Sequence, residues 1–294
     1  MSPEISFITA VHNGLDASKL MLETFHATVC RNDYEFIFVD DASEDDSRQY
    51  LSNLPAPFHF YTNRRTRGFA GANNYGVQKS NGRILVFLNN DLLFYQPWLE
   101  PMLDALEIPS VGAVGNIQYK KGKGLIDHAG MFFDQDGMAR QARKNTRRIP
   151  PGSHTEWNSI SGACMAIRRE TFIATGGFDE QYRNGCEDVD LSIRLRIQGF
   201  RLLVANQSQI CHVGGASPGR HDHDAENESR FLSLWQDTTS TWAVNEWPRE
   251  YLVRYSRLWW KLNPLKALQA CWLFFRQRQT NRSVIVHSTH AGGT

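Results

Sequence analysis

Two groups of polar and acidic residues carry the clearest chemical signal in this sequence. Residues 183–191 read Arg-Asn-Gly-Cys-Glu-Asp-Val-Asp-Leu, which puts Glu187 and Asp188 at the start of a helix. Earlier in the chain, Asn89-Asn90-Asp91 ends a buried apolar strand. A carboxylate at a strand end can hold a divalent cation, and one at a helix start can accept a proton as a general base. The two groups together indicate metal-assisted, base-catalysed transfer chemistry.

Each acidic group also has a structural explanation. Carboxylates in the first turn of a helix stabilise its dipole, and Arg194 lies one turn beyond Asp190, where the two side chains are expected to pair. Asp40 and Asp41 end another apolar strand, where adjacent carboxylates repel each other and lose hydration. Either one of them caps the helix that follows or they contact a ligand, and the sequence leaves both interpretations open.

Three further motifs add weaker signals. Asn13-Gly14 follows the first strand as a turn whose backbone could meet a planar base. Residues 68–76 open a helix with small side chains, which let the backbone approach a ligand, but they lack the Gly-Lys-Ser/Thr ending of a P-loop. His212 is followed by Val-Gly-Gly, so its imidazole is either a buried core group or a metal ligand that faces a cleft.

The elements that must position these residues alternate along the chain. Runs rich in Ile, Val and Phe predict buried strands at 5–11, 35–39, 58–61, 84–88 and 111–114. Helices are expected at 18–30, 45–54, 69–80 and 98–106. This alternation is typical of an α/β fold with parallel strands and helices on both faces of the sheet. Such a sheet binds ligands beyond the carboxyl ends of its strands.

The middle of the chain has a different pattern. Asp-Gln-Asp-Gly at 134–137, between apolar stretches, predicts a hairpin within 130–141. Further strands are expected at 157–167 and 200–204, with a helix at 189–198. We expect these elements to complete the same mixed sheet and to form the second side of the ligand cleft.

Composition and charge are those of a folded globular protein. Hydrophobic residues make up 41% and charged residues 21% of the 294 positions, which excludes a disordered chain. The five cysteines form no Cys-x-x-Cys pair and leave one over, which favours a reducing compartment. The first residues lack the basic and apolar pattern of a secretion signal, so we expect a cytoplasmic protein.

The segment 226–294 differs in charge from the rest of the chain. From Arg249 onward it has one acid, Glu250, although the net charge of the whole chain is only +1. The basic residues are Arg249, Arg254, Arg257, Lys261, Lys266, Arg276, Arg278 and Arg282, and the apolar ones between them include Leu258, Trp259, Trp260, Leu265, Leu268, Trp272 and Phe275. Such a segment either lies peripherally in an anionic membrane interface or packs on the protein or on a second subunit. Its apolar stretch 267–275 is too short to cross a bilayer, and no nucleic-acid-binding motif is present.

In this order, the motifs resemble the inverting glycosyltransferases of family two, which have the GT-A fold, and especially their bacterial rhamnosyltransferase-like branch. The resemblance covers residues 5–217. It rests on the motifs at 39–43 (Val-Asp-Asp-Ala-Ser), 68–76, 87–91 (Phe-Leu-Asn-Asn-Asp), 161–169 (Ser-Gly-Ala-Cys-Met-Ala-Ile-Arg-Arg), 176–180 (Gly-Gly-Phe-Asp-Glu), 187–191 and 212–215. Each motif alone is loose, whereas their order and spacing together are specific.

The resemblance implies an α/β architecture for this chain, with a Rossmann-like, mostly parallel mixed sheet flanked by helices. It also implies a catalytic domain at 1–225, followed by a helical, basic and aromatic extension at 226–294. Within the catalytic domain, the nucleotide-binding half would span about 1–115 and the acceptor half about 116–225.

The resemblance also implies roles for individual residues. Asp188 matches the catalytic base, with Glu187 as the alternative or helper. Asp91 matches the last position of the family's Asp-x-Asp metal motif, and His212 matches a histidine that joins the metal in some members. Asp41 would contact the donor's pyrimidine. The other donor-binding residues are expected to be Thr9, Val11, Asn13, Gly71, Asn73, Asn90, Gly162 and Ala163.

One position departs from the family's pattern. Asn89 stands where the metal motif has its first Asp, which removes a negative charge. A divalent cation, Mn²⁺ or Mg²⁺, would then be held mainly by Asp91, His212 and the diphosphate of the donor. The sequence therefore leaves open whether activity requires the metal.

We expect an inverting glycosyltransferase of the hexosyl or rhamnosyl type. It would move a sugar from a UDP- or dTDP-sugar to a hydroxyl of a glycan or lipid-linked saccharide, in bacterial surface polysaccharide synthesis, with no nucleic-acid partner. One alternative is a non-catalytic nucleotide-sugar-binding module, which Asn89 favours. A sugar nucleotidyltransferase is less favoured, because residues 9–14 lack the basic, glycine-rich loop which that class needs.

Overall fold

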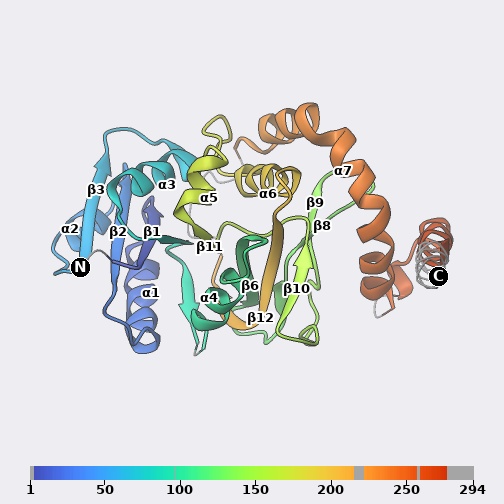
Figure 1. The fold of residues 1–294 in the computed structure, drawn as a ribbon, viewed down its shortest axis with the longest axis horizontal. Helices are drawn as coiled ribbons and strands as arrows, with labels where there is room; N and C mark the ends of the chain where they lie inside the picture. Colours follow the sequence, from blue (N-terminus) through green and yellow to red (C-terminus); the bar gives the residue numbers. More distant parts are fainter. Residues whose placement is uncertain (1–2, 96, 215–221, 257–258, 277–294) are drawn as a thin grey trace, which may run out of the picture.

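A computed structural model describes residues 3–95, 97–214, 222–256 and 259–276. Its centre is one large mixed sheet with helices on both faces, and a long helix lies at the side opposite the N-terminus (Figure 1). Some residues discussed above lie outside the described ranges: Gly215, Ser217, Arg257, Leu258, Arg278 and Arg282.

Strands and helices alternate through the first half of the chain, as predicted. The strands are β1 (Ile5–Val11), β2 (Tyr34–Asp41), β3 (Phe58–Asn63), β4 (Ile84–Leu88), β5 (Leu92–Phe94), β6 (Val111–Lys120), β7 (Ile126–His128), β8 (Met131–Phe133), β9 (Ala139–Gln141), β10 (His154–Trp157), β11 (Cys164–Arg168) and β12 (Arg201–His212). The helices are α1 (Leu15–Thr28), α2 (Ser47–Ser52), α3 (Gly68–Lys79), α4 (Glu100–Leu106), α5 (Arg169–Ala174), α6 (Glu187–Ile197), α7 (Asp224–Tyr255) and the short 3₁₀ helix η1 (Trp259–Lys261).

The first four strands run parallel in the order β3-β2-β1-β4. Their register places Val11 opposite Asp40, so β1 and β2 end at the same edge of the sheet. Strand β11 is inserted antiparallel between β4 and β6, and β12 and β10 complete the sheet. The predicted mixed α/β sheet is confirmed, and its parallel half brings the polar strand ends together.

The alternation of side chains along the central strands builds two hydrophobic layers. Phe7 and Phe36 face the layer that includes Phe25 of α1, with 4.8 Å between the ring centroids of Phe7 and Phe25. Ile8 and Ile37 face the opposite layer, against α3 and α6. Fully burying each such side chain stabilises the fold by about 1.5–3 kcal/mol. The two layers hold the strand ends in fixed positions.

The strand predicted at 157–167 is instead two strands in different places of the sheet. Strand β10 pairs with β12, whereas β11 lies between β4 and β6. The chain leaves the sheet over residues 158–163 and re-enters it further in. The prediction was wrong because it joined the apolar ends of the segment, Trp157 and residues 163–167, across the polar residues Asn158, Ser159 and Ser161, where the chain leaves the sheet.

Two other predictions for the middle of the chain need correction. The hairpin of β8 and β9 forms as predicted, but it is a separate two-stranded sheet and not part of the main one. The strand predicted at 200–204 continues as β12 to His212. Its register with β6 shifts between Ala205 and Gln209, and the buried polar residues Asn206 and Ser208 interrupt the apolar pattern, which hid the continuation.

Helix α7 packs against the hairpin through a half-buried carboxylate. Glu246 accepts hydrogen bonds from the backbone N–H of Phe133 at 3.1 Å and of Asn158 at 3.3 Å. Burial nevertheless raises the pKa of Glu246 to about 7, because the charged form loses its hydration. Helix α7 begins at Asp224, near the boundary at 225 given above, and the division into two domains stays a prediction.

The apolar residues of the C-terminal segment fall into two groups. Trp247, Tyr251 and Ala270 are buried in the layer that covers α6, so part of the segment packs on the protein. The other group is exposed and contains Trp259, Trp260, Leu265, Leu268, Trp272 and Phe275. Within the part of the chain that the structure describes, no helix is both long and apolar enough to pass through a bilayer.

Glu246 predicts a specific dependence of stability on pH. Its pKa is about 7 in the folded state and 4.5 in an unfolded chain, so the native state binds the extra proton between these values. Its contribution to stability is therefore present below pH 4.5 and is lost as the pH rises through 7. We expect the free energy of unfolding to fall by roughly 3 kcal/mol over this range, and Glu246→Gln to abolish that fall.

Urea denaturation at a series of pH values measures this effect. Glu228→Gln, an exposed glutamate of the same helix, is the matched control and should keep the wild-type slope. Equal slopes for Glu246→Gln and the wild type would contradict the assignment.

Candidate active site

A cleft of about 780 Å³ lies at the edge where the parallel strands end. Its lining combines residues from the end of β1, the turn after β4, the start of α6 and the end of β12. Of the residues singled out in the sequence, it contains Val11, Asp41, Asn89, Asn90, Asp91, Gly162, Ala163, Glu187, Asp188 and His212. The fold therefore brings to one cavity side chains that are far apart in the sequence.

Asp91 and His212 lie side by side because β5 pairs with the end of β12. The pairing sets His212 opposite Leu92, the residue after Asp91. The Nε2 atom of His212 is 3.2 Å from Oδ1 of Asp91, and the N–H of Gly214 donates to Oδ2 at 3.1 Å. Burial alone would raise the pKa of Asp91, but the His212 ring and the Gly214 N–H hold it below its usual value.

This pair fits a divalent cation. The Nε2 atom of His212 is buried and has no aligned hydrogen-bond partner among the described residues, and its close neighbour is a carboxylate oxygen. A nitrogen and a carboxylate oxygen suit Mn²⁺, and Mg²⁺ commonly takes only one or two carboxylates from a protein. In the described ranges there is no cluster of three or more His, Cys, Asp or Glu, so water or a bound ligand would have to supply the remaining ligands.

Asn89 and Asn90 hold the turn between β4 and Asp91. The N–H of Asn89 donates to the carbonyl of Ala163 at 2.9 Å, which extends the β4–β11 pairing by one residue. The side-chain amide of Asn90 donates to the carbonyl of Asn13 and to the hydroxyl of Ser18, at 3.2 and 3.1 Å. Both residues line the cleft, and their hydrogen bonds fix the direction in which the chain delivers Asp91.

Asp188 and Glu187 have different surroundings although they are adjacent. Oδ2 of Asp188 accepts from the N–H of Gly162 at 2.7 Å, and Oδ1 accepts from the N–H of Val189 at 2.8 Å. The side chain of Glu187 turns back and accepts from the N–H of Gly185 at 2.6 Å, which closes the turn before α6. Asp188 is therefore held against the cleft wall, at a helix N-terminus that stabilises its negative charge.

Gly162 lies where the wall closely approaches α6. A Cβ atom at this position would lie 3.0 Å from Cβ of Asp188 and 3.3 Å from the ring of Phe69, so a side chain here would force these neighbours to move by a few tenths of an ångström. Glycine therefore favours the close approach of its backbone N–H to the Asp188 carboxylate.

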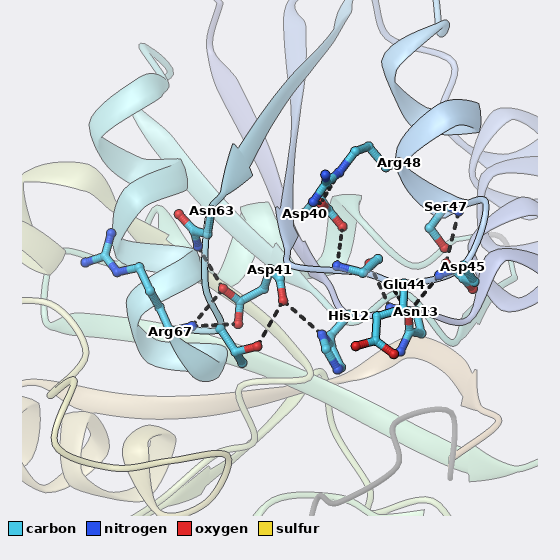
Figure 2. Close-up of polar contacts among 12 residues, drawn as sticks. His12, Asn13, Asp40, Asp41, Glu44, Asp45, Ser47, Arg48, Asn63 and Arg67 are labelled. Carbon is cyan, nitrogen blue, oxygen red and sulfur yellow. Dashed lines mark hydrogen bonds and ion pairs between the residues drawn. The ribbon is translucent and has the colours of Figure 1, made fainter.

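The adjacent carboxylates Asp40 and Asp41 have separate structural partners, as Figure 2 shows. Asp40 pairs with Arg48 at 2.8 Å. Asp41 accepts from the side chain of Asn63 at 2.8 Å and from the backbone N–H groups of Arg67 and Gly68, at 2.9 and 2.8 Å. Asp41 thus caps α3, and not the helix that follows it in sequence. It also lines the cleft, and its contact with a pyrimidine stays a prediction.

The turn after β1 is held by Asn13 (Figure 2). Its Oδ1 accepts from the N–H groups of Glu44 and Asp45, at 2.7 and 3.2 Å, and its own N–H donates to Ser43 at 2.8 Å. The residue has a left-handed φ of 62°, which asparagine tolerates better than most side chains. Asn13 therefore joins two loops, and it does not line the cleft.

Three other predicted donor-binding residues also lie outside the cleft lining. Thr9 is fully buried within β1. Asn73 is buried in α3, where its amide donates to the carbonyl of Phe69. Gly71 faces the side chain of Arg67, which a Cβ atom would approach to 2.8 Å. Gly71 and Asn73 thus contribute to the packing of α3, and their contact with a donor stays a prediction.

His128 is a residue of the cleft that the sequence analysis missed. It is buried, its Nδ1 atom has no hydrogen-bond partner among the residues described, and burial lowers its pKa to about 4. The lining also contains Lys120, at the end of β6, and Lys121 and Lys123, from the turn between β6 and β7. Strand β7 has only three residues, which is too short for a recognisable alternation.

Comparisons with known proteins relate the chain to sugar-transferring enzymes. A family described as Glycosyl transferase family 2 matches residues 6–176, and one described as the N-terminal domain of galactosyltransferase matches residues 147–214. Over 157 residues the chain is 34% identical to the O-antigen biosynthesis protein RfbC of Myxococcus xanthus. This match covers 51% of the chain but only 12% of that protein, so the chain spans a small part of its relative.

Two solved structures share the fold. GalNAc-T7 with UDP, GalNAc and Mn²⁺ has a TM-score of 0.65 and 17% sequence identity, over 81% of this chain and 49% of that one. The mannosyltransferase PcManGT from Pyrobaculum calidifontis, in complex with GDP-Man and Mn²⁺, has a TM-score of 0.54 and 17% identity, over 99% and 80% of the two chains. The predicted α/β GT-A fold is thereby confirmed.

The contacts of Asp41 predict a large loss of stability when its carboxylate is removed. Asp41→Ala leaves the N–H groups of Arg67 and Gly68 without an acceptor at a buried helix start. We expect a cost of roughly 3 kcal/mol, measured by urea denaturation. Asp104→Ala, at an exposed position of α4, is the control and should change stability by less than about 0.5 kcal/mol. An Asp41→Ala protein as stable as the control would show that the cap is dispensable.

Proposed function

The chain belongs to glycosyl transferase family 2, and from this premise we propose that it is an inverting glycosyltransferase that uses a nucleotide-diphosphate sugar. The donor is a UDP- or dTDP-sugar, and the transferred group is of the hexosyl or rhamnosyl type. The acceptor is a hydroxyl of a glycan or lipid-linked saccharide. The reaction belongs to the synthesis of a bacterial surface polysaccharide.

One observation carries the proposal. The cleft that contains the adjacent pair Asp91 and His212 also contains Asp188, which comes from a different element. A transferase of this type needs a site for the diphosphate and a base for the acceptor, both open to the same space. The cleft volume of about 780 Å³ is that of a site for a ligand of nucleotide-sugar size.

In the proposed reaction, Asp188 accepts the proton of the acceptor hydroxyl. The hydroxyl oxygen forms a bond to the anomeric carbon from the face opposite the nucleotide, while the bond from that carbon to the diphosphate oxygen breaks. The configuration at the anomeric carbon is inverted. The hydrogen bonds from Gly162 and Val189 orient the carboxylate of Asp188 for this task. Glu187 supports it by closing the preceding turn.

Asp91 and His212 would hold the divalent cation, Mn²⁺ or Mg²⁺, with Asn89 beside them in the cleft. When bound, the cation offsets the negative charge that develops on the diphosphate leaving group. The Mn²⁺ named with GalNAc-T7 and PcManGT supports this part of the proposal. The neutral Asn89 lowers the negative charge of the site, so the diphosphate itself must contribute much of the attraction for the metal.

Three observations support a location for the proposed reaction. The name of the relative RfbC supports a role in the synthesis of a surface glycan. The cysteine pattern of the sequence supports the cytoplasm, and the basic, aromatic C-terminal segment supports a peripheral position at the inner face of the membrane.

Asp188→Asn tests the assignment of the base. The amide keeps the size of the side chain but cannot take up the proton, so we expect turnover to fall about a hundredfold or more while donor affinity is kept. Release of UDP or dTDP from a panel of nucleotide sugars, with and without acceptors, measures turnover. Glu187→Gln is the matched comparison and should retain more activity, because Glu187 bonds to its own turn.

Unchanged turnover in Asp188→Asn with a loss in Glu187→Gln would exchange the two roles. A wild-type protein that binds nucleotide sugars without ever releasing the nucleotide would instead be the non-catalytic binding module that Asn89 favours.

Asp91→Asn and His212→Ala test the metal site. We expect each to reduce by more than about tenfold the gain in UDP affinity that Mn²⁺ produces, as measured by calorimetry with Mn²⁺ and with a chelator. Asp127→Asn is the control, since this cleft carboxylate pairs with Lys120 at 3.6 Å. A UDP affinity that does not respond to Mn²⁺ in the wild type would remove the metal from the proposal.

A further inference from the structure

A second cavity, of about 270 Å³, lies between the β8–β9 hairpin and the C-terminal half of α7. The hairpin separates it from the catalytic cleft. Met131 lines the cleft, the next residue Phe132 lines the second cavity, and Gln141 borders both. A ligand in the second cavity would therefore sit one strand pair away from the cleft, on its acceptor side.

The lining of this second cavity is strongly cationic. It contains two carboxylates, Asp134 and Glu250, against the basic side chains of Arg140, Arg143, Lys144, Arg254, Lys261 and Lys266. Glu250 is nearly buried and lies 3.5 Å from Arg143, and Asp134 lies 3.7 Å from Arg140. Each carboxylate is thus matched by one arginine.

The other four cations have no acidic partner in the described part of the chain. Lys144 donates to the side-chain oxygen of Gln141, and Arg254 lies over the ring of Tyr255. Like charges gathered around a concave surface repel one another and create a positive potential there, which an anion relieves. The cavity therefore has the charge of a site for a phosphate group.

Apolar side chains are exposed beside the same cations. Trp259 and Trp260 are 74% and 62% exposed and directly precede Lys261. Leu265 and Leu268, at 78% and 69%, flank Lys266. The segment is tied to α7, because the hydroxyl of Tyr251 both accepts from the N–H of Asn263 at 3.1 Å and donates to its carbonyl. Exposed Trp and Leu next to Lys are the composition of a surface that enters a membrane interface.

We propose that this cavity binds the phosphate headgroup of an anionic phospholipid while Trp259, Trp260, Leu265 and Leu268 enter the interface. Charge complementarity accounts for the cavity, and the exposed apolar residues favour a bilayer over a soluble phosphate compound or a nucleic acid. The inference rests on the peripheral membrane position proposed above, and it identifies the cavity as the place where the lipid headgroup binds. Docking in this way sets the Met131 side of the catalytic cleft next to the bilayer, where the saccharide of a lipid-linked acceptor can enter.

Co-sedimentation of the full chain with vesicles tests the proposal. We expect binding to mixed phosphatidylcholine–phosphatidylglycerol vesicles and little to phosphatidylcholine alone. Binding should weaken as NaCl rises from about 0.1 to 1 M, where the Debye length falls from about 10 to 3 Å. Lys261→Gln/Lys266→Gln should lower the partition coefficient about thirtyfold, since each basic residue near an anionic surface contributes about 1 kcal/mol.

The matched control is Lys19→Gln/Lys79→Gln, which removes the same charge from α1 and α3 and should bind vesicles as the wild type does. Trp259→Ala/Trp260→Ala should also weaken vesicle binding, and because both side chains are exposed the fold should persist. Nucleotide release from soluble sugar donors should be unchanged in all three variants, so a failure of this inference is separate from a failure of the transfer reaction.

Three results would overturn the inference. Equal vesicle binding by the Lys261/Lys266 variant and its control would show that the cavity does not contribute to vesicle binding. Binding of soluble glycerol phosphate that is as tight as vesicle binding, and indifferent to the tryptophans, would make the ligand a free phosphate compound. Failure of the wild type to bind anionic vesicles at low salt would remove the lipid altogether.

Discussion

The cleft depends on hydrogen bonds that tie the start of α3 to the turn before α6. Asp41 fixes the first residues of α3 from the end of β2. The side chain of Asn184 then accepts from the N–H of Phe69 at 2.9 Å, and Arg67 pairs with Glu180 at 2.8 Å. These contacts join segments more than a hundred residues apart in sequence. Asn74 adds to this link, because its side chain donates to the carbonyl of Phe178 and accepts from the N–H of Phe178.

The strand arrangement of the sheet is the second constraint that positions the cleft residues. Its parallel strands bring Asp41 and Asp91 to one edge, and the long β12, which runs parallel to β6, ends at the same edge with His212. The insertion of β11 beside β4 brings Gly162 and Ala163 to the wall that receives Asp188. Asp91, His212 and Asp188 thus line one cavity, because the strand ends and the start of α6 meet at this edge of the sheet.

The sequence predicted those parts of the fold in which local pattern and tertiary neighbour agree. The predicted bounds of β1 and β4 are the same as the observed ones. The expected ion pair between Asp190 and Arg194 also forms, at 2.7 Å. The sequence did not predict roles that depend on contacts between residues far apart along the chain. Asn13 accepts from the N–H of Glu44, thirty-one residues away, and the sequence gives no sign of this contact, whereas its contact with a base stays a prediction. His128 could not be found because its strand is too short to show a period.

Strands β8 and β9 pair with each other. Among the described residues, a single bridge between Met131 and Ser159 is the only other strand-type contact of the hairpin, so the register of the main sheet does not constrain its length. It nevertheless forms the partition between two cavities. Changes of length or side chain there would alter the walls of both cavities while leaving the strand pairing of the main sheet intact. The hairpin is therefore the part of the cleft wall that can vary most without disturbing the sheet.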